Sequence, residues 1–219
     1  MESEQRKNAI RGAYHLTGSN NFYDGMITCS TFSGKAVCRM VWAMNRQECE
    51  DYLSKALSGI PEDFAGKMLE VPVGTGILTM PVYQTLPKAD VTCLDYSPDM
   101  MGQAKEKAEK LNLTNVKFQQ GDVGALPFAD GEFDLVLSLN GFHAFPDKEA
   151  AYRETFRVLK SGGTFCGCFY VSGEHKRTDW MIRHGYEPTS LWKRLQGMYA
   201  QVNVGSLKSI AWFICRKAD

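Results

Sequence analysis

Two kinds of segment alternate between residues 67 and 171. Short apolar runs with little polar interruption recur as KMLEVPV, DVTCLD, FDLVLSLN and GTFCGCFYV. Longer stretches of helical character, such as SPDMMGQAKEKAEKLN and DKEAAYRETFRV, lie between them. Apolar runs of this kind are typical of strands that helices cover on both faces, and strands alternating with helices favour right-handed βαβ units. The pattern predicts an α/β chain with a doubly wound, mostly parallel sheet.

Capping residues indicate where the helices begin and end. Ser97 followed by Pro98 predicts an N-cap and a first helical residue, and Asp147 predicts a second N-cap. Gly162-Gly163 predicts the C-terminal end of that second helix. These signals are local, so they place boundaries without defining how the elements pack.

The two flanks of this region have their own patterns. A helix is predicted over Val41–Leu57, with Gly59 and Pro61 ending it. Near the C-terminus, the runs QVNVGSL and SIAWFIC are separated by almost no residues. That spacing requires a hairpin, so the last two strands should be antiparallel to each other.

Charge and cysteine content disfavour several classes of protein. Lys plus Arg and Asp plus Glu number 25 each, whereas a general nucleic-acid binder needs a surplus of positive charge. The seven cysteines include no CxxC pair, which argues against disulfides or structural zinc and favours a cytoplasmic setting. No metal is expected. We also expect no signal peptide and no membrane span, because no apolar run approaches about 20 residues.

The first candidate for chemistry is LEVPVGTG, residues 69–76. A predicted strand ends there in a glycine-containing turn before a helix, which brings backbone N–H groups and a helix N-terminus toward a ligand. Gly74 and Gly76 lack the side chains that would block close approach. The same pattern also occurs in plain βα turns, so the turn alone does not establish a site.

Acidic residues follow the next two predicted strands. Asp95 lies 21 residues after Gly74, where a carboxylate can accept hydrogen bonds from a ribose diol. Asp122 lies in QQGDVGALPF, where a carboxylate beside the Val123 amide can read the edge of adenine. The alternatives are a capping or solvated aspartate at position 95 and a surface aspartate at position 122.

In this order and spacing, LEVPVGTG, VTCLDYSPDMM, GDVGALPFADGEFDLVLS and FRVLKSGG resemble the class I S-adenosylmethionine-dependent methyltransferases. The likeness is greatest to the branch of ubiquinone/menaquinone-biosynthesis-type small-molecule methyltransferases. It covers about residues 67–171. It implies a Rossmann-like, seven-stranded sheet with an antiparallel last strand, S-adenosyl-L-methionine as cofactor, S-adenosyl-L-homocysteine as product, and methyl transfer to a small molecule by in-line displacement.

The resemblance also implies one domain with three parts. Residues 1–66 would form an N-terminal helical lid, residues 67–171 the cofactor-binding core, and residues 172–219 a substrate-side segment and the terminal hairpin. The loop after the first strand would surround the methionine half of the cofactor, Asp95 would hold the ribose, and Asp122 would meet the adenine. The implied cofactor-binding residues are Glu70, Val71, Pro72, Gly74, Thr75, Gly76, Asp95, Tyr96, Met100, Asp122, Val123 and Asn140.

Pro72 departs from the family's pattern, which is acidic-x-Gly-x-Gly-x-Gly. Proline keeps its carbonyl acceptor but lacks the N–H and holds φ at about −65°. This departure keeps open a second hypothesis, a non-catalytic protein that binds S-adenosylmethionine or S-adenosylhomocysteine. A third hypothesis is an NAD-dependent oxidoreductase. Its fingerprint is G-x-G-x-x-G/A, whereas this chain has Gly-x-Gly-x-x-Thr, and this hypothesis gives Glu70 no role.

The methyl acceptor is predicted to be a small molecule, with no nucleic-acid partner. The fourth strand is not followed by the [Asp/Asn/Ser]-Pro-Pro-[Tyr/Phe] tetrapeptide that base-methylating relatives use. His143 is the candidate general base, needed only for a protonated acceptor; alternatively, it packs against neighbouring phenylalanines. Aromatic residues outside the cofactor core suit an apolar acceptor. The candidate substrate residues are Tyr23, Phe142, His143 and Tyr170.

Overall fold

The computed structural model describes residues 4–13, 22–28, 31–37, 39, 43–142, 144–171 and 188–219. One seven-stranded sheet in the order β3-β2-β1-β4-β5-β7-β6 forms its centre. The strands are β1 (Lys67–Glu70), β2 (Asp90–Asp95), β3 (Val116–Gln120), β4 (Phe133–Leu139), β5 (Leu159–Tyr170), β6 (Gln201–Leu207) and β7 (Ile210–Arg216). All neighbours pair in parallel except β7, which is antiparallel to both β5 and β6. The predicted sheet and hairpin are confirmed.

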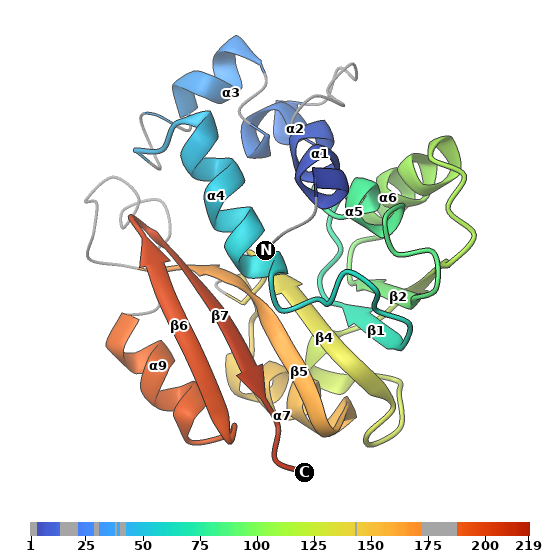
Figure 1. Ribbon diagram of the computed structural model, residues 1–219, viewed down its shortest axis with the longest axis vertical. Coiled ribbons are helices and arrows are strands. Elements are labelled where there is room, and N and C mark those ends of the chain that lie inside the picture. Colours follow the sequence, from blue (N-terminus) through green and yellow to red (C-terminus); the bar gives the residue numbers. More distant parts are fainter. Residues whose placement is uncertain are drawn as a thin grey trace.

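Helices pack on both faces of this sheet (Figure 1). They are α1 (Glu4–Ala13), α2 (Phe22–Ile27), α3 (Phe32–Val37), α4 (Arg46–Leu57), α5 (Met80–Tyr83), α6 (Pro98–Lys110), α7 (Lys148–Val158) and α9 (Pro188–Gln196). A 3₁₀ turn, η2 (Val123–Ala125), follows β3. None of the helices within the described ranges is long and apolar enough to cross a membrane.

Alternate residues of each central strand enter two separate apolar cores. Met68 packs with the cluster that α4, α5 and α6 cover, whereas Leu69 belongs to the cluster that α7 and α9 cover. Leu135 and Val136 divide in the same way on β4. Because both faces are buried, the strands read as continuous apolar runs, which is the pattern that predicted a doubly wound sheet.

The predicted N-caps are confirmed. Ser97 accepts from the Met100 N–H before α6, and Asp147 accepts from the Ala150 N–H before α7. These side chains satisfy backbone donors that lack a partner in the first helical turn, and so they fix where each helix starts.

Two predicted helix boundaries are wrong. The helix predicted from Val41 begins at Arg46, because Asn45 and Glu48 form a capping box there. The helix predicted to end at Gly162-Gly163 ends at Val158. Leu159 pairs with Phe133 in β4, so the chain is already extended, and the glycines lie where the β4–β5 register shifts.

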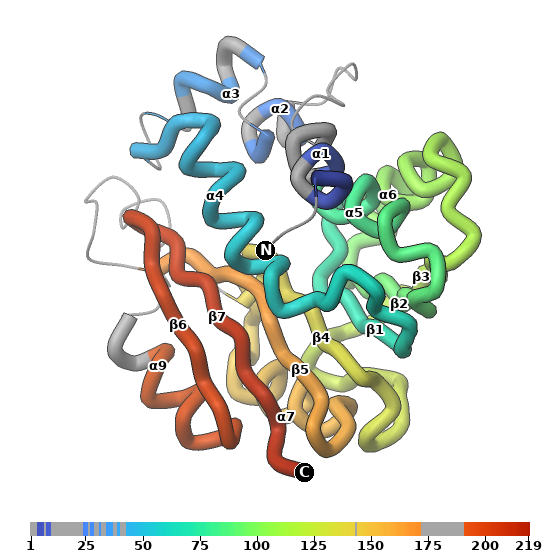
Figure 2. The backbone as a smooth tube through the Cα atoms, viewed as in Figure 1, coloured from blue at the N-terminus to red at the C-terminus, as the bar shows by residue number. Residues whose placement is uncertain are grey.

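Helices α2 and α3 contact each other, and the tube in Figure 2 shows α1, α2 and α3 toward the same end of the sheet. Helix α1 contacts both α4 and α5. The Arg6 side chain, nearly all buried, donates to the carbonyls of Ile60 and Pro61 after α4. These contacts attach the described part of the N-terminal region to the body of the domain.

Candidate functional site

The candidate site lies where the strand order reverses. β1 neighbours both β2 and β4, so the loops that follow β1 and β4 leave the sheet at adjacent points and run to opposite faces. In open α/β sheets, ligands bind beyond the carboxyl ends of strands at such a point. The segments that meet here are Val71–Gly76 after β1, Asp95 at the end of β2, and Asn140 after β4.

The two glycines of the first loop have different roles. Both have positive φ, +56° at Gly74 and +67° at Gly76, a region that disfavours other residues. A Cβ at Gly74 would meet no atom within 4 Å, so this backbone borders open space. A Cβ at Gly76 would lie 2.9 Å from Met80 Cγ and 3.1 Å from Ala104 Cβ. Gly74 therefore leaves room for a ligand, whereas Gly76 allows close packing of the loop on two helices.

Asp95 holds this loop in place. Its Oδ2 accepts a hydrogen bond from the Gly74 N–H at 2.7 Å, and its Oδ1 accepts from the Ser97 N–H at 2.9 Å. The side chain is only 7% exposed. Each carboxylate oxygen has further lone pairs, so the group can also accept from ligand hydroxyls. The predicted ribose acceptor is thus also a clamp between β2 and the glycine loop.

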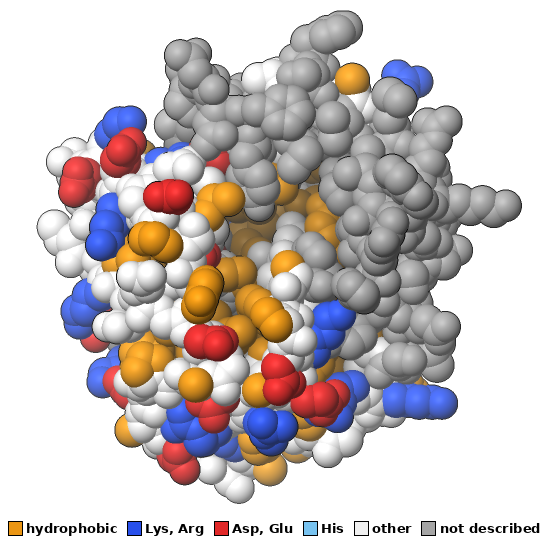
Figure 3. All heavy atoms as spheres, turned by 180° about the vertical axis from the view of Figure 1, so that it is seen from behind, with side chains coloured by type: hydrophobic (Ala, Val, Ile, Leu, Met, Phe, Trp, Pro, Cys, Tyr) orange, Lys and Arg blue, Asp and Glu red, His pale blue; other side chains and the backbone are white. Residues whose placement is uncertain are grey.

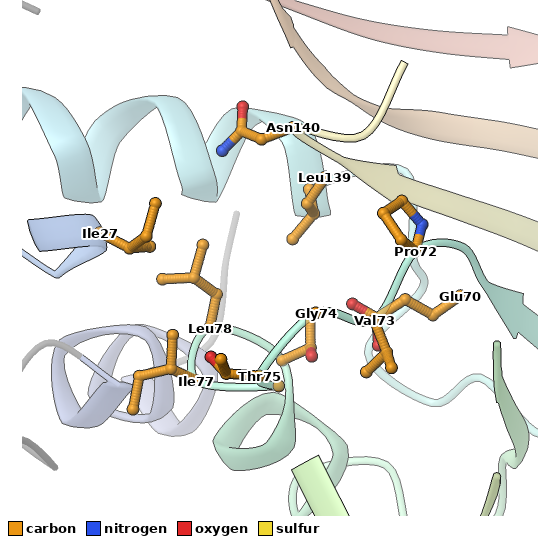
Figure 4. A pocket seen from close by; sticks show the side chains of 12 residues that line it. Ile27, Glu70, Pro72, Val73, Gly74, Thr75, Ile77, Leu78, Leu139 and Asn140 are labelled. Carbon is orange, nitrogen blue, oxygen red and sulfur yellow. The ribbon is translucent and has the colours of Figure 1, made fainter. Parts of the chain in front are cut away.

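Two cavities adjoin the loop. The large cavity, about 600 Å³, lies beyond β2 and β3 and is lined by Asp95, Asp122 and Val123, among others. The small cavity, about 80 Å³, is lined by Glu70, Thr75 and Leu78, among others (Figure 4). Pro72, Gly74 and Asn140 line both. Every predicted cofactor-binding residue lines one of the two cavities.

The large cavity combines apolar walls with carboxylates. Tyr96, which is 77% exposed, and Met100 form part of the wall, with Phe145 and Pro146 among the other lining residues. Figure 3 shows a hollow near the centre of the face opposite to Figure 1, with hydrophobic side chains inside it. Such a mixture suits a ligand with a planar apolar part and a polar edge.

Asp122 is exposed, caps a turn and borders the large cavity. The side chain caps η2, with Oδ1 accepting from the Gly124 N–H at 2.8 Å, and it is exposed. It also lines the large cavity, as does the buried Val123. Capping fixes the carboxylate at the cavity edge and uses only Oδ1, so Oδ2 is not needed for the cap.

Glu70 lies beneath the loop rather than along it. Its side chain is buried, and Oε2 accepts from the Tyr83 hydroxyl at 2.7 Å. Burial raises the pKa of this carboxyl to about 8, although hydrogen bonds from neighbouring groups act in the opposite direction. Glu70 lines the small cavity. The carboxyl therefore joins β1 to α5 and borders the cavity at the same time.

Asn140 has an unusual backbone conformation. It is a non-glycine residue with φ of +52°, its N–H donates to the Cys168 carbonyl at 2.8 Å, and its Oδ1 accepts from Cys168 Sγ at 3.4 Å. Conformations of this kind concentrate at functional sites because the surrounding structure must hold them. Figure 4 shows Asn140 and Leu139 facing the glycine loop across the small cavity.

Pro72 fits the site because the residue that its ring packs against, Gly141, has no side chain. The Val71–Pro72 peptide bond is cis, and the ring lies against Gly141, where an added Cβ would overlap Pro72 Cδ. The ring lines both cavities without filling the open space beside Gly74. The departure from the family pattern is therefore matched by a glycine two residues after the end of β4.

Sequence reasoning missed the residues that fix the loop after η2. Arg157 on α7 donates to the Leu126 carbonyl at 3.0 Å and to the Phe128 carbonyl at 2.8 Å. Glu154 accepts from the Leu126 N–H at 2.8 Å and pairs with Arg157. Their i,i+3 spacing reads as an ordinary surface ion pair, so no sequence signal connected them with the cavity.

The candidate substrate residues are placed differently. Phe142 is fully buried in an aromatic cluster, with its ring centroid 4.5 Å from that of Tyr152 and 4.7 Å from that of Phe169, and it lines neither cavity. Tyr170 is buried in the core that α4 covers. Tyr23 belongs to α2, and both its side chain and His143 lie outside the described residues.

Comparison with known proteins agrees with this geometry. Residues 68–163 match the methyltransferase domain family. A demethylmenaquinone methyltransferase from Thermus thermophilus is 41% identical over 97 residues, which are 44% of each chain. The chain thus spans less than half the length of this relative.

Two solved structures share the fold. One, the [4+2]-cyclase SpnF, has a TM-score of 0.69 at 18% identity and covers 79% of this chain and 82% of its own. The other is an S-adenosylmethionine-dependent methyltransferase from Aquifex aeolicus, with a TM-score of 0.61 at 19% identity. The match covers 75% of this chain and 88% of the methyltransferase. The chain is therefore a Rossmann-like α/β protein that shares its fold with both of these structures. Within this fold, residues 68–163 are the part that matches the methyltransferase domain family.

Proposed function

We propose that this chain is an S-adenosylmethionine-dependent methyltransferase that acts on a small-molecule acceptor, in the cytoplasm. The observation that carries the proposal is the meeting of two cavities at Gly74, with the Asp95 carboxylate beside it. The five cysteines within the described residues are buried thiols, which is consistent with a reducing compartment. Because the fold also occurs in a cyclase, the site rather than the fold supports the activity.

The residues present fit S-adenosylmethionine. Asp95 would accept the ribose hydroxyls, Asp122 and the Val123 amide would meet the adenine, and Tyr96 with Met100 would cover its faces. The open space at Gly74 would admit the ligand close to the backbone. The methionine portion would extend to the small cavity, where Glu70 and Thr75 are among the polar lining residues.

The cofactor supplies a methyl group already activated as an electrophile. The protein then needs only to orient the acceptor in line and to exclude water. The loop after β1 and Asn140 after β4 border the position where the two cavities meet, and they would define the direction of approach. His143 remains our proposed base, and only for an acceptor that must lose a proton.

An aromatic, largely apolar acceptor is our proposal for the substrate class. The relative from Thermus thermophilus is named for a quinone-type acceptor, and the described walls of the large cavity are mainly apolar. We also propose that the N-terminal helices act as a lid and that residues 172–219 contribute to the acceptor side.

Two measurements test the function. Calorimetric titration should show binding of S-adenosylmethionine and S-adenosylhomocysteine but not NAD. Incubation with methyl-labelled S-adenosylmethionine and a panel of hydroquinones and phenols should then give a labelled product. Binding without a labelled product from this panel or from a metabolite extract would favour a non-catalytic binding protein, and absence of binding would refute both hypotheses.

A further inference from the structure

A buried carboxylate connects the N-terminal region with the glycine loop. Asp24 on α2 is 1% exposed. Its Oδ1 accepts a hydrogen bond from the Thr75 hydroxyl at 2.6 Å, and its Oδ2 lies 2.9 Å from Lys107 Nζ of α6. Asp24 and Thr75 are 51 residues apart in the chain. Asp24 lies outside both the loop motif and the segments that carry the family resemblance.

The same helix forms a wall of the small cavity. Ile27, one turn beyond Asp24, lines that cavity together with Thr75. Figure 4 shows Ile27 beside Leu78, on the far side of the cavity from Pro72. The Thr28 hydroxyl donates to the Asp24 carbonyl at 2.7 Å at the end of the helix. The position of this wall therefore depends on how Asp24 is held.

A charge excluded from water is stable only when it is paired and hydrogen-bonded. Among the described residues, the two partners of the Asp24 carboxylate come from the glycine loop and from α6, and neither comes from its own helix. Helix α2 can thus keep its charge buried only while Thr75 and Lys107 are in place. Thr75 in turn follows Gly74, whose N–H is bound by Asp95. A continuous series of contacts links α2 to the predicted ribose acceptor.

We propose that Asp24 is a positioning residue that couples docking of α2 to cofactor binding. A bound cofactor would hold the loop and stabilise the docked helix, and the docked helix would close the methionine end of the site. By linkage, the factor by which the cofactor favours docking equals the factor by which the docked state binds the cofactor more tightly than the undocked state. This inference rests on the proposed function, because it concerns the same cofactor site.

The experiment compares Asp24→Asn with Asp90→Asn. Asp90 forms an exposed ion pair with Lys117 at 2.8 Å, at the opposite end of β2 from Asp95, so its variant controls for loss of a carboxylate. The probe is S-adenosylhomocysteine. Calorimetry measures its Kd, and hydrogen exchange measures protection of the Phe22–Thr28 amides with and without the probe.

We expect the probe to slow exchange of the α2 amides in the wild-type chain and in Asp90→Asn. In Asp24→Asn this added protection should be lost and Kd should rise about tenfold or more, while Asp90→Asn stays within about twofold of wild type. If Asp24→Asn does not fold, Lys107→Gln replaces it, with a smaller rise in Kd expected. A merely structural role would lower the urea midpoint without abolishing the probe-dependent protection of α2.

The outcomes separate the two claims. If the wild-type chain binds the probe but Asp24→Asn and Lys107→Gln match Asp90→Asn in Kd and protection, the coupling is refuted and the proposed function stands. If the wild-type chain binds neither S-adenosylmethionine nor S-adenosylhomocysteine, the proposed function is refuted, and the coupling falls with it.

Discussion

Replacing Asp95 by asparagine should weaken cofactor binding strongly while leaving the fold intact. The variant keeps the shape of the side chain, but it loses the charge and presents an amide donor where Asp95 now accepts hydrogen bonds from Gly74 and Ser97. A hydrogen bond to a charged group contributes about 1.5–3 kcal/mol. Since about 1.4 kcal/mol corresponds to tenfold in Kd, we expect a rise of roughly 10- to 150-fold.

The same substitution should also lower stability. Asparagine can accept through one oxygen only, so one of the two N–H groups loses its partner, at a cost of about 1–3 kcal/mol for a buried group. Calorimetry with S-adenosylhomocysteine measures the Kd at a temperature where both chains are folded, and urea denaturation measures the free energy of unfolding. Asp90→Asn, on the same strand but distant from the cavities, is the control. An unchanged Kd in Asp95→Asn would refute the ribose assignment.

Three further predictions concern the loop and its support. Gly74→Ala should reduce cofactor affinity more than stability. Gly76→Ala should instead lower the free energy of unfolding by about 1–3 kcal/mol, because the added Cβ crowds Met80. Cofactor titrations and urea curves measured on both variants would contradict this if the two variants behaved alike. Because the pKa of Glu70 is raised to about 8 in the folded chain, wild-type stability should fall as the pH rises from about 5 to above 8, and Glu70→Gln should remove that slope in urea denaturation at several pH values. Arg157→Met should speed amide exchange at residues 121–128 and raise the cofactor Kd several-fold, whereas the same change at the exposed Arg153 of α7 should do neither.

The direction of this pH dependence follows from the direction in which the pKa of Glu70 is shifted. An unfolded glutamate titrates near its ordinary pKa of 4.5, and the folded carboxyl keeps its proton up to about pH 8. Between these values the folded state binds more protons, so stability falls as the pH rises. Equal slopes in wild type and Glu70→Gln would show that this carboxyl is not the cause.

Much of the fold was predictable from local patterns. Continuous apolar runs predicted strands buried on both faces, and the near absence of residues between the last two runs required a hairpin. Ser97 and Asp147 were recognised as caps because a cap depends only on the residues within one helical turn. Gly162 misled the prediction because a glycine with positive φ serves equally well at an irregular strand position.

The sequence by itself therefore determined the strands of the sheet, two helix caps and the terminal hairpin, because these are encoded by short-range spacing. Its resemblance to a known family supplied twelve of the residues that line the two cavities. Only the tertiary structure decided that Asp95 also clamps Gly74, that Gly141 makes room for Pro72, and that Arg157 and Asp24 hold the loops from a distance. These contacts join residues that are distant in the chain and that packing brings together. No periodicity or spacing in a single sequence indicates such contacts.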